Sequence, residues 1–381
     1  MTVSGHSRLL KILHIDPERR WGGGEAQVLG LLSYLAERGH HNDLLTDPDG
    51  RLFQQSQALS VRTLPLVVCN DLDFRPIPKL RRLIRDENYD VIHFHTKRAH
   101  ALSFWLSHGT PGPKYVVTRR MDYPESRSWY TRYLYNRKVD GVIAISGKIR
   151  ELLIEAGVQR ERIRLIHSGI DPRPFETAAN DRAVDCERIV VGMIAVLEER
   201  KGHRVLLEAA RRLKARGCQI GYRLAGEGPL RKSLEETTIQ LGLNQDVRFL
   251  DFVSDIPAFL NSVDVVVLPS LFEGLGVSVL EAMAAGKAVI ASRAGGLADV
   301  VVDAVTGFLV APGDAEALAN AIVKLAGDRS LSREMGQKGK ARLKEHFTME
   351  QMAKKNEGYY YALLEKNQDR WHGPETGSTL S

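Results

Sequence analysis

The sequence predicts an α/β protein with two doubly wound parallel sheets, one in each half of the chain. The chain has 381 residues, more than the ~250–300 residues at which a single hydrophobic core stops growing. Short, nearly continuous apolar runs alternate with longer segments of helical periodicity, as in parallel sheets that helices cover on both faces. This alternation runs through the first half and repeats in the second, which predicts two domains in tandem.

The predicted strands are short apolar runs, rich in β-branched residues and separated by turn-forming and polar residues. In the first half we expect strands at Lys11–Ile15, His41–Leu45, Val61–Leu66, Val91–Phe94, Tyr115–Thr118, Gly141–Ile145 and Arg164–His167. In the second half we expect strands at Ile189–Ala195, Ile220–Ala225, Val247–Leu250, Val265–Leu268, Ala288–Ser292 and Gly307–Val310.

The predicted helices lie between these strands. Residues Ala26–Arg38 place apolar side chains three and four positions apart, and the same periodicity occurs in Arg204–Arg216, Ala315–Ala326 and Ser332–His346. A last helix, from Met349 to about Lys366, carries three tyrosines and two leucines. It is too apolar to be solvated on all sides, so it must pack on another part of the protein.

The polar residues 172–187, rich in proline and alanine, separate the two predicted domains. We therefore expect an N-terminal domain over residues 1–175 and a C-terminal domain over residues 187–348. Residues 367–381 have the composition of a disordered tail.

The composition is that of a soluble globular enzyme, with 43% hydrophobic and 26% charged residues. The longest apolar run, Ile189–Leu197, is far shorter than the ~20 residues of a membrane-spanning helix. Lys11 interrupts the first apolar patch, so no signal peptide is expected and the cytoplasm is the expected location. The three cysteines are far apart and show no disulfide or zinc spacing, so we expect them to be reduced: Cys69, Cys186 and Cys218.

The positive charge is concentrated in the first half of the chain. Residues 1–180 hold 27 Lys and Arg against 20 Asp and Glu, whereas residues 181–381 hold 26 against 27. This asymmetry indicates an anionic partner for the first half: a membrane surface, a phosphorylated acceptor or nucleic acid.

In each half of the chain one motif follows the first predicted strand. Gly22, Gly23 and Gly24 open a helix; glycine permits positive φ and close approach to a ligand, and the helix N-terminus favours an anion. Arg200 and Lys201 suit a diphosphate in the crevice of an open sheet. The alternatives are a tight turn without a ligand and a solvated basic pair.

The most specific motif runs from Glu273 to Ala284. Glu273 lies on a glycine-bearing loop after a buried strand, and Glu281 lies inside the helix that begins near Val277. Eight helical steps would separate the two glutamates by ~12 Å, whereas a hydrolase places its carboxylates ~5–9.5 Å apart. The amides around Gly276 would face a phosphate. The alternative is that Glu273 caps the helix and Glu281 is a surface charge.

Together these motifs resemble glycosyltransferase family 4 (group 1), whose members are retaining, nucleotide-sugar-dependent enzymes with the GT-B fold. The resemblance extends from about Ile12 to Leu364 and is closest to bacterial enzymes that build lipopolysaccharide or other surface glycans. It implies two Rossmann-like domains that face each other across a cleft, with the final helix, residues 349–366, crossing back to the first domain. The segments that carry it are Gly22–Gly24, Ser168–Asp171, Arg200–Gly202, Gly226–Leu230, Glu273–Glu281 and the glycine-rich stretch after it.

The resemblance implies that the N-terminal domain binds the acceptor and the C-terminal domain the nucleotide-sugar. Glu273 would hydrogen-bond the donor sugar, and Glu281 the ribose. Arg200 and Lys201 would neutralise the diphosphate leaving group, so that no metal or cofactor is required. The remaining binding positions are the backbone of Gly274, Leu275, Gly276 and Val277 at the diphosphate, Phe252 and Val253 near the base, and Gly22, Gly23 and Gly24 closing from the other domain.

The sequence departs from the family pattern at three positions. Val196 stands where many members have an arginine, for which Arg200 would substitute, and Ser168 stands where many have an asparagine. Many members also have a histidine just after the strand that we place at Tyr115–Thr118. Here Arg120 or Asp122 would fill its role: Asp122 could orient or deprotonate the acceptor hydroxyl, and Arg120 could bind phosphate.

Three further features lie in the first half. His93 and His95 alternate at a strand end, on one face, without an evident third ligand for zinc, so polar packing is expected. The basic and aromatic run Arg119–Lys138 suits a lipid headgroup interface, and without an RNA-binding motif we place a membrane or lipid-linked acceptor before nucleic acid. The Asp47–Asp49 and Asp71–Asp73 pairs end no clear buried strand and lack further metal ligands.

The sequence thus predicts a retaining hexosyltransferase that uses a UDP- or GDP-sugar and a glycan or lipid-linked acceptor in lipopolysaccharide or surface-polysaccharide synthesis. It would act in the cytoplasm or at the inner face of the cell membrane, without nucleic acid. The alternatives are a nucleotide-sugar epimerase of similar fold, a NAD-dependent oxidoreductase and a non-catalytic nucleotide-sugar-binding protein.

Overall fold

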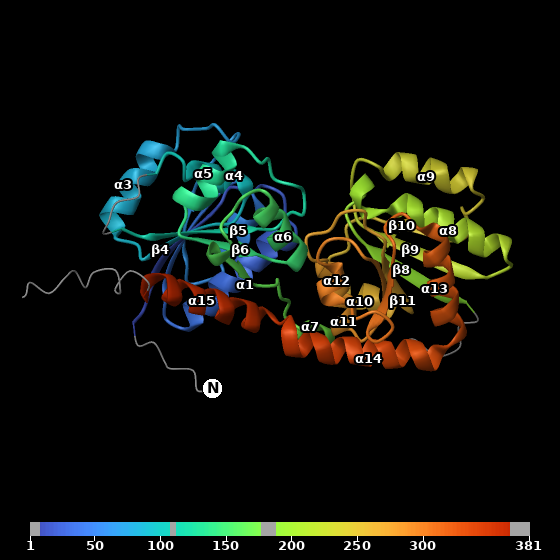
Figure 1. The fold of residues 1–381 in the computed structure, drawn as a ribbon. Helices are drawn as coiled ribbons and strands as arrows, with labels where there is room; N and C mark the ends of the chain where they lie inside the picture. The colour runs from blue at the N-terminus through green and yellow to red at the C-terminus, as the bar shows by residue number, and fades with distance from the viewer. Residues whose placement is uncertain (1–7, 107–111, 177–187, 366–381) are drawn as a thin grey trace, which may run out of the picture.

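Two parallel sheets form the frame of the molecule (Figure 1). The computed structural model describes residues 8–106, 112–176 and 188–365. The first sheet has the order β3-β2-β1-β4-β5-β6-β7, with strands β1 (Lys11–Asp16), β2 (His41–Thr46), β3 (Arg62–Pro65), β4 (Val91–Phe94), β5 (Lys114–Arg119), β6 (Gly141–Ala144) and β7 (Ile163–Leu165). The second has the order β10-β9-β8-β11-β12-β13, with β8 (Ile189–Ile194), β9 (Ile220–Ala225), β10 (Val247–Leu250), β11 (Val265–Leu268), β12 (Ala288–Ser292) and β13 (Gly307–Val310).

Each predicted strand is present, and its ends lie within two residues of the predicted ones. The strands at the centre of each sheet are buried along their length, as their apolar runs predicted. The α/β class with two doubly wound parallel sheets is confirmed. We call the part around the first sheet the N-terminal lobe and the part around the second sheet the C-terminal lobe.

Helices connect consecutive strands. Those of the N-terminal lobe are α1 (Gly23–Glu37), α2 (Arg51–Ser56), α3 (Ile77–Glu87), α4 (Lys97–Leu102), α5 (Trp129–Arg137), α6 (Gly147–Glu155) and α7 (Arg173–Glu176). Those that follow are α8 (His203–Ala215), α9 (Arg231–Gln240), α10 (Ile256–Asn261), α11 (Val277–Ala284), α12 (Leu297–Val300), α13 (Ala315–Gly327), α14 (Arg329–His346) and α15 (Met349–Glu365).

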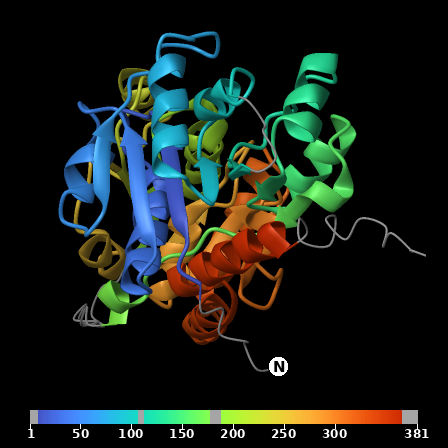
Figure 2. The same cartoon turned by 90° about the vertical axis from the view of Figure 1, so that its left-hand side faces the viewer.

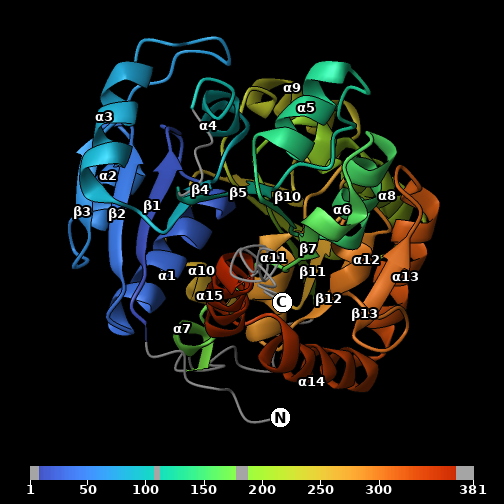
Figure 3. The same ribbon diagram turned by 60° about the vertical axis from the view of Figure 1, so that its left-hand side comes forward.

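The last helix, α15, crosses from the C-terminal lobe back to the N-terminal lobe, as predicted. Figures 1 and 3 show α14 and α15 as consecutive helices, the first below the C-terminal lobe and the second below the N-terminal lobe. Figure 2 views the N-terminal lobe from its own side, with α15 running across its lower part. Glu357 on α15 accepts hydrogen bonds from Arg38 at 2.8 Å and from Tyr34 at 3.3 Å, and lies 2.9 Å from His40.

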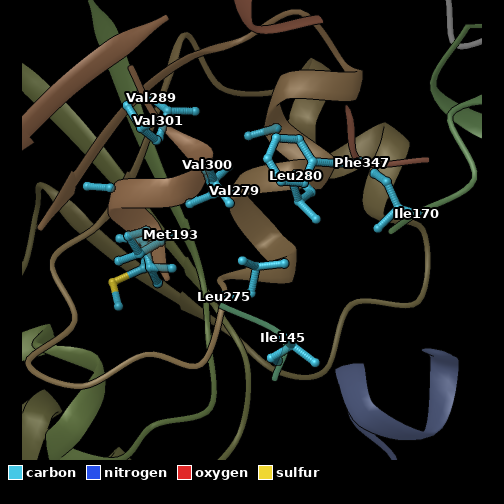
Figure 4. Packing of buried hydrophobic residues seen from close by; sticks show 14 of the residues in the cluster. Ile145, Ile170, Met193, Leu275, Val279, Leu280, Val289, Val300, Val301 and Phe347 are labelled. Carbon is cyan, nitrogen blue, oxygen red and sulfur yellow. The ribbon is translucent and has the colours of Figure 1, made fainter. Parts of the chain in front are cut away.

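One buried apolar cluster extends through both lobes. It contains Ile145 of the N-terminal lobe together with Leu275 and Leu280 of the C-terminal lobe (Figure 4). Because side chains of both lobes share a core, the two lobes contact each other through apolar as well as polar groups.

Two sequence predictions fall outside the described residues: the tail at 367–381 and most of the linker at 172–187. In the described part of the chain, no helix has the length and apolarity that a membrane crossing needs.

Candidate active site between the lobes

The order of each sheet reverses between two neighbouring strands. In the first sheet β1 and β4 are neighbours, with His14 opposite His93, and in the second β8 and β11 are neighbours. Ligands of open α/β sheets bind outside the carboxyl ends of the strands at such a switch point. The loops that follow these ends in one lobe contact those of the other lobe, which makes this contact region the candidate site.

Lys201 and Glu273 form a nearly buried ion pair at the switch point of the second sheet. Lys201 ends a 3-10 turn, Glu199–Lys201, after β8, and Glu273 lies on the loop after β11. Their Nζ and Oε2 atoms are 2.5 Å apart, and the two side chains are only 12% and 9% exposed. Ser270 donates a second hydrogen bond to the same oxygen, at 3.2 Å. The two residues predicted to hold the leaving group and the sugar therefore lie together.

Asp122 of the N-terminal lobe adjoins this pair. Its Oδ2 accepts the backbone N–H of Glu273 at 2.7 Å. Burial raises the pKa of Asp122, and the hydrogen bond from the backbone N–H of Glu273 acts to lower it. The carboxylate of the N-terminal lobe therefore contacts the loop that carries Glu273.

Arg200 is placed differently from Lys201. Its Nε donates to Glu198 at 2.8 Å, so its guanidinium is paired within its own turn. Its backbone carbonyl accepts the N–H of Leu271 at 2.7 Å and thereby fixes the start of the loop that carries Glu273. Val196, at the position where many family members have an arginine, is exposed.

Glycines allow the backbones of the two lobes to meet. A Cβ on Gly274 would lie 2.2 Å from the carbonyl oxygen of Arg120, and one on Gly295 would lie 2.8 Å from Asp122 Oδ2. Gly276 has a φ of +91° and caps α11, which begins at Val277 with its amides unpaired by a side chain. Any larger residue at Gly274 would force the lobes apart.

The glycines after β1 behave differently from the prediction. None of Gly22, Gly23 and Gly24 has a positive φ, and α1 begins at Gly23 rather than at Ala26. They are instead sites of close contact, since a Cβ on Gly23 would lie 3.0 Å from Val277 Cγ2 and one on Gly24 would lie 3.4 Å from Arg120 Cδ. The expected close approach is present, but its partner here is protein.

Glu281 lies in the second turn of α11 and is half-buried. Burial raises its pKa to about 7, and its carboxylate has no hydrogen-bond partner among residues 8–106, 112–176 and 188–365.

The two residues predicted near the base differ in exposure. Phe252 is 53% exposed, and the guanidinium of Arg51 from the other lobe lies 5.0 Å from the centroid of its ring. Val253 packs on the core.

The side chains of Arg120 and Asp122 have different neighbours. Asp122 faces Glu273, whereas Arg120 is influenced by Asp16 and Glu25 of its own lobe, which act against the lowering of its pKa by burial. Sequence reasoning did not single out Asp16 or Glu25 as candidates. Asp16 ends a predicted strand at the ligand-binding edge of the sheet, and that position was a usable signal.

His93 and His95 do have a third histidine nearby, which the sequence did not make evident. One ring nitrogen of His14, on the neighbouring strand, lies within 4.8 Å of one nitrogen of each of them. Both nitrogens of His93 are nevertheless occupied by hydroxyls, those of Tyr360 and Thr118, each at 2.7 Å, and His14 Nδ1 lies 3.0 Å from His95 Nε2. The polar packing that the sequence predicts is present. The cluster is a hydrogen-bonded polar core, and we do not assign a metal to it.

The two aspartate pairs are held by arginines. Asp47 does follow a buried strand, contrary to the prediction, but its Oδ2 accepts from Arg19 at 2.7 Å. Asp73 accepts from Arg75 at 2.7 Å and from the N–H of Cys69 at 3.0 Å.

A second bridge between the lobes was not predicted. Asp299 on α12 accepts the N–H of Gly147, the first residue of α6, at 2.6 Å and lies 3.3 Å from His167 Nε2. Burial alone would raise the pKa of Asp299, but the contacts with His167 and Gly147 lower it. The carboxylate thus caps a helix of the other lobe.

Comparisons with known proteins agree with this architecture. Residues 21–173 match the family described as Glycosyltransferase Family 4, and residues 175–342 match Glycosyl transferases group 1. A lipopolysaccharide core biosynthesis glycosyltransferase of Rhizobium meliloti is 31% identical, over 86% of this chain and 93% of that protein. A capsular polysaccharide biosynthesis glycosyltransferase of Staphylococcus aureus is 24% identical, over 78% of this chain and 83% of that protein. An Anabaena protein crystallised with UDP and glucose has the same fold, with a TM-score of 0.79 and 23% identity over 93% of this chain and all of that one.

The ion pair at the centre of the site predicts a stability effect. Lys201→Met leaves the Glu273 carboxylate buried without its partner, which typically costs about 3–5 kcal/mol. We expect the free energy of unfolding in urea to fall by about that amount, and Glu273→Gln added to Lys201→Met to restore most of it. The control is Lys338→Met, whose partner Glu334 is exposed and which should cost below about 1 kcal/mol. Equal losses in Lys201→Met and the double variant would contradict the prediction.

Proposed function

The chain belongs to the glycosyltransferase family 4 (group 1) proteins, and from this membership we propose that it transfers a hexose-type sugar from a UDP- or GDP-sugar to a hydroxyl of a glycan or a lipid-linked acceptor. The proposed reaction retains the configuration at the anomeric carbon. The relatives compared above include enzymes of lipopolysaccharide and polysaccharide synthesis. The observation that carries the proposal is the Lys201–Glu273 pair at the switch point of the second sheet, beside the amides of α11.

In the proposal the C-terminal lobe, residues 187–348, binds the donor. Lys201 Nζ and the first amides of α11 would receive the diphosphate, and Glu273 would then accept hydroxyls of the sugar. Arg200 would add positive charge after leaving Glu198. Glu281 would hold the ribose, and Phe252 with Val253 would line the base. Three observations support this division of roles: the opposed charges of Lys201 and Glu273, the first amides of α11, which no side chain caps, and the carboxylate of Glu281, which has no hydrogen-bond partner among the described residues.

The proposed step breaks the bond between the anomeric carbon and the β-phosphate oxygen. A bond forms between that carbon and the acceptor oxygen on the same face, and the acceptor proton passes to the departing phosphate. Lys201 would stabilise the charge that develops there, so no divalent metal is invoked. The Glu273 carboxylate is held by Lys201 and Ser270, which supports a role on sugar hydroxyls rather than as a nucleophile.

The acceptor would bind the N-terminal lobe, residues 1–175 with the crossing helix. Asp122 is the better placed of the two residues that could replace the family histidine, because it adjoins Glu273. We assign Asp122 to the acceptor hydroxyl.

A thermal-shift screen with UDP-, GDP- and ADP-linked sugars tests the donor. A ligand at a hundred times its Kd stabilises the folded protein by about 2.7 kcal/mol, so sugars linked to one nucleotide base should raise the Tm.

Lys201→Ala should lower kcat/KM about 10²–10³-fold, whereas Lys338→Ala should not. The reaction should proceed in the presence of EDTA, because no divalent metal is invoked. NMR of the product should show that the anomeric configuration of the donor sugar is retained. An epimerised donor without any transfer, or an inverted product, would refute the proposal.

Glu281 predicts a pH dependence of donor binding. Its pKa is raised to about 7, so the carboxylate that would accept ribose hydroxyls is mostly protonated at pH 6 and ionised at pH 8. The Kd of the donor should therefore fall as pH rises from 6 to 8, and Glu281→Gln should flatten this dependence. Glu334→Gln, an exposed glutamate on α14, is the matched control. An unchanged pH profile in Glu281→Gln would argue against the ribose role.

An anionic membrane surface is the proposed partner of the N-terminal lobe. Aromatic rings run in contact from Phe74 through Trp105 and Phe104 to Tyr133 and Trp129. Tyr133 and Trp129 belong to α5, Phe74 precedes α3, and Phe104 and Trp105 follow α4. Figure 1 labels these three helices. Exposed arginines occur on or beside α3 and α5: Arg81, Arg82, Arg85, Arg127, Arg132 and Arg137. We call this set the aromatic–basic surface, and its composition suits a headgroup interface.

Sedimentation with vesicles tests this partner. We expect the protein to bind vesicles that contain phosphatidylglycerol but not pure phosphatidylcholine, with binding that weakens as salt rises. Trp129→Ser with Arg82→Gln should reduce it severalfold, whereas Ile239→Ser, at an exposed apolar residue of α9, should not. Binding that is absent or insensitive to salt would favour a soluble acceptor.

A further inference from the structure

Asp16 is a buried carboxylate with an unused oxygen. It ends β1, at the switch point of the N-terminal sheet, and is 1% exposed. Its Oδ1 accepts the N–H of Glu18 at 3.2 Å, whereas its Oδ2 has no hydrogen-bond partner among the described residues. An unsatisfied buried polar atom costs free energy and needs an explanation. A ligand group at this oxygen would provide one.

Arg120, which follows β5, is a second charged group without a partner nearby. Within the described ranges its guanidinium makes no hydrogen bond or ion pair, and its Nε is buried and unsatisfied. It does influence Asp16 and Glu25 electrostatically, and burial raises the pKa of both carboxyls. The three charged groups therefore lie near enough to influence one another, and among the described residues no ion pair joins them.

A small cavity of mixed lining adjoins Arg120. Its other polar residues are Gln27, His93, Thr118, Ser168 and Asn356, and the rest of its lining is apolar. Gly24 brings the first turn of α1 against the Arg120 side chain, and Gly23 brings it against Val277 at the start of α11. The first turn of α1 therefore contacts both Arg120 and the end of α11 that the proposed donor diphosphate would occupy.

The charges indicate what the cluster of Asp16, Glu25 and Arg120 would bind. One guanidinium faces two carboxyls, so the cluster offers no net attraction to a phosphate. The free Oδ2 accepts hydrogen bonds and the free Nε donates one, which matches the paired donor and acceptor character of sugar hydroxyls. Hydrogen bonds to charged groups are worth about 1.5–3 kcal/mol each.

We propose that Asp16, Glu25 and Arg120 form a binding subsite for hydroxyl groups of a neutral sugar on the acceptor, next to the hydroxyl that is glycosylated. The subsite rests on the proposed glycosyltransferase function and adds to it the class of acceptor residue that is recognised. It replaces the sequence-based assignment of Arg120 to a phosphate.

The test compares neutral and anionic probes as acceptors, with the donor found by thermal shift. The neutral probes are octyl glucoside, octyl galactoside and octyl mannoside, and the anionic probe is glucose 6-phosphate. We expect transfer to at least one octyl glycoside and a lower kcat/KM for glucose 6-phosphate. Asp16→Asn should raise the KM of that glycoside about 10- to 100-fold while the donor-induced Tm shift persists. Glu25→Gln should act in the same direction.

The matched control is Asp43→Asn, on the adjacent strand β2. Asp43 is also buried, but its carboxylate accepts from Tyr89 and lies outside the subsite. Its acceptor KM should match that of the unaltered protein. An unchanged KM in Asp16→Asn, preferred transfer to glucose 6-phosphate, or donor hydrolysis without transfer to any octyl glycoside would overturn the subsite alone. Absence of any donor-induced Tm shift and of donor turnover would overturn the proposed function as well.

Discussion

The structure depends on backbone contact between the two lobes, which only glycine permits. At Gly274 and Gly295 a single added carbon would meet backbone or carboxylate atoms of Arg120, Glu273 or Asp122. Because the chains approach so closely, Asp122 reaches the backbone N–H of Glu273 across the interface. The position of the C-terminal loop is thus set by a residue of the other lobe, and a movement of either lobe would move the carboxylate that is proposed to hold the sugar.

The charged groups in this contact region are better explained by function than by stability. A buried ion pair such as Lys201–Glu273 is often no more stabilising than a well-packed apolar pair, because both ions lose hydration. Here the partners compensate each other while no ligand is bound. A diphosphate near Lys201 and hydroxyls near Glu273 would supply the same compensation, so the exchange would leave neither charge unpaired. Mutual pairing in the free protein is therefore compatible with the donor roles proposed for both residues.

The fold was largely predictable from the sequence, whereas the site was only partly so. Apolar runs and helical periodicity located every strand, because local pattern determines local structure. The same reasoning placed Lys201 and Glu273 at strand ends of one sheet, and the structure pairs them. It could not find His14 or Asp299, whose neighbours lie on other strands or in the other lobe, and it overlooked Asp16 although that residue directly follows a predicted strand. For Gly22–Gly24 it left open both a positive φ and a close approach, because glycine permits either and sequence alone does not distinguish the two.

The excess positive charge of the first half indicates an anionic partner, and the structure separates two locations for charge that the sequence merges. At the carboxyl edge of the N-terminal sheet one arginine, Arg120, faces Asp16 and Glu25, so the inner site carries no positive excess. Exposed arginines occur on α3 and α5, among them Arg81, Arg82, Arg85, Arg132 and Arg137. The positive charge on α3 and α5 would act on the surface that the lobe approaches, whereas hydrogen-bond geometry at the sheet edge would select the hydroxyl that the proposed reaction glycosylates. In this proposal the net charge of the domain bears on docking, and a few buried side chains determine which acceptor is recognised.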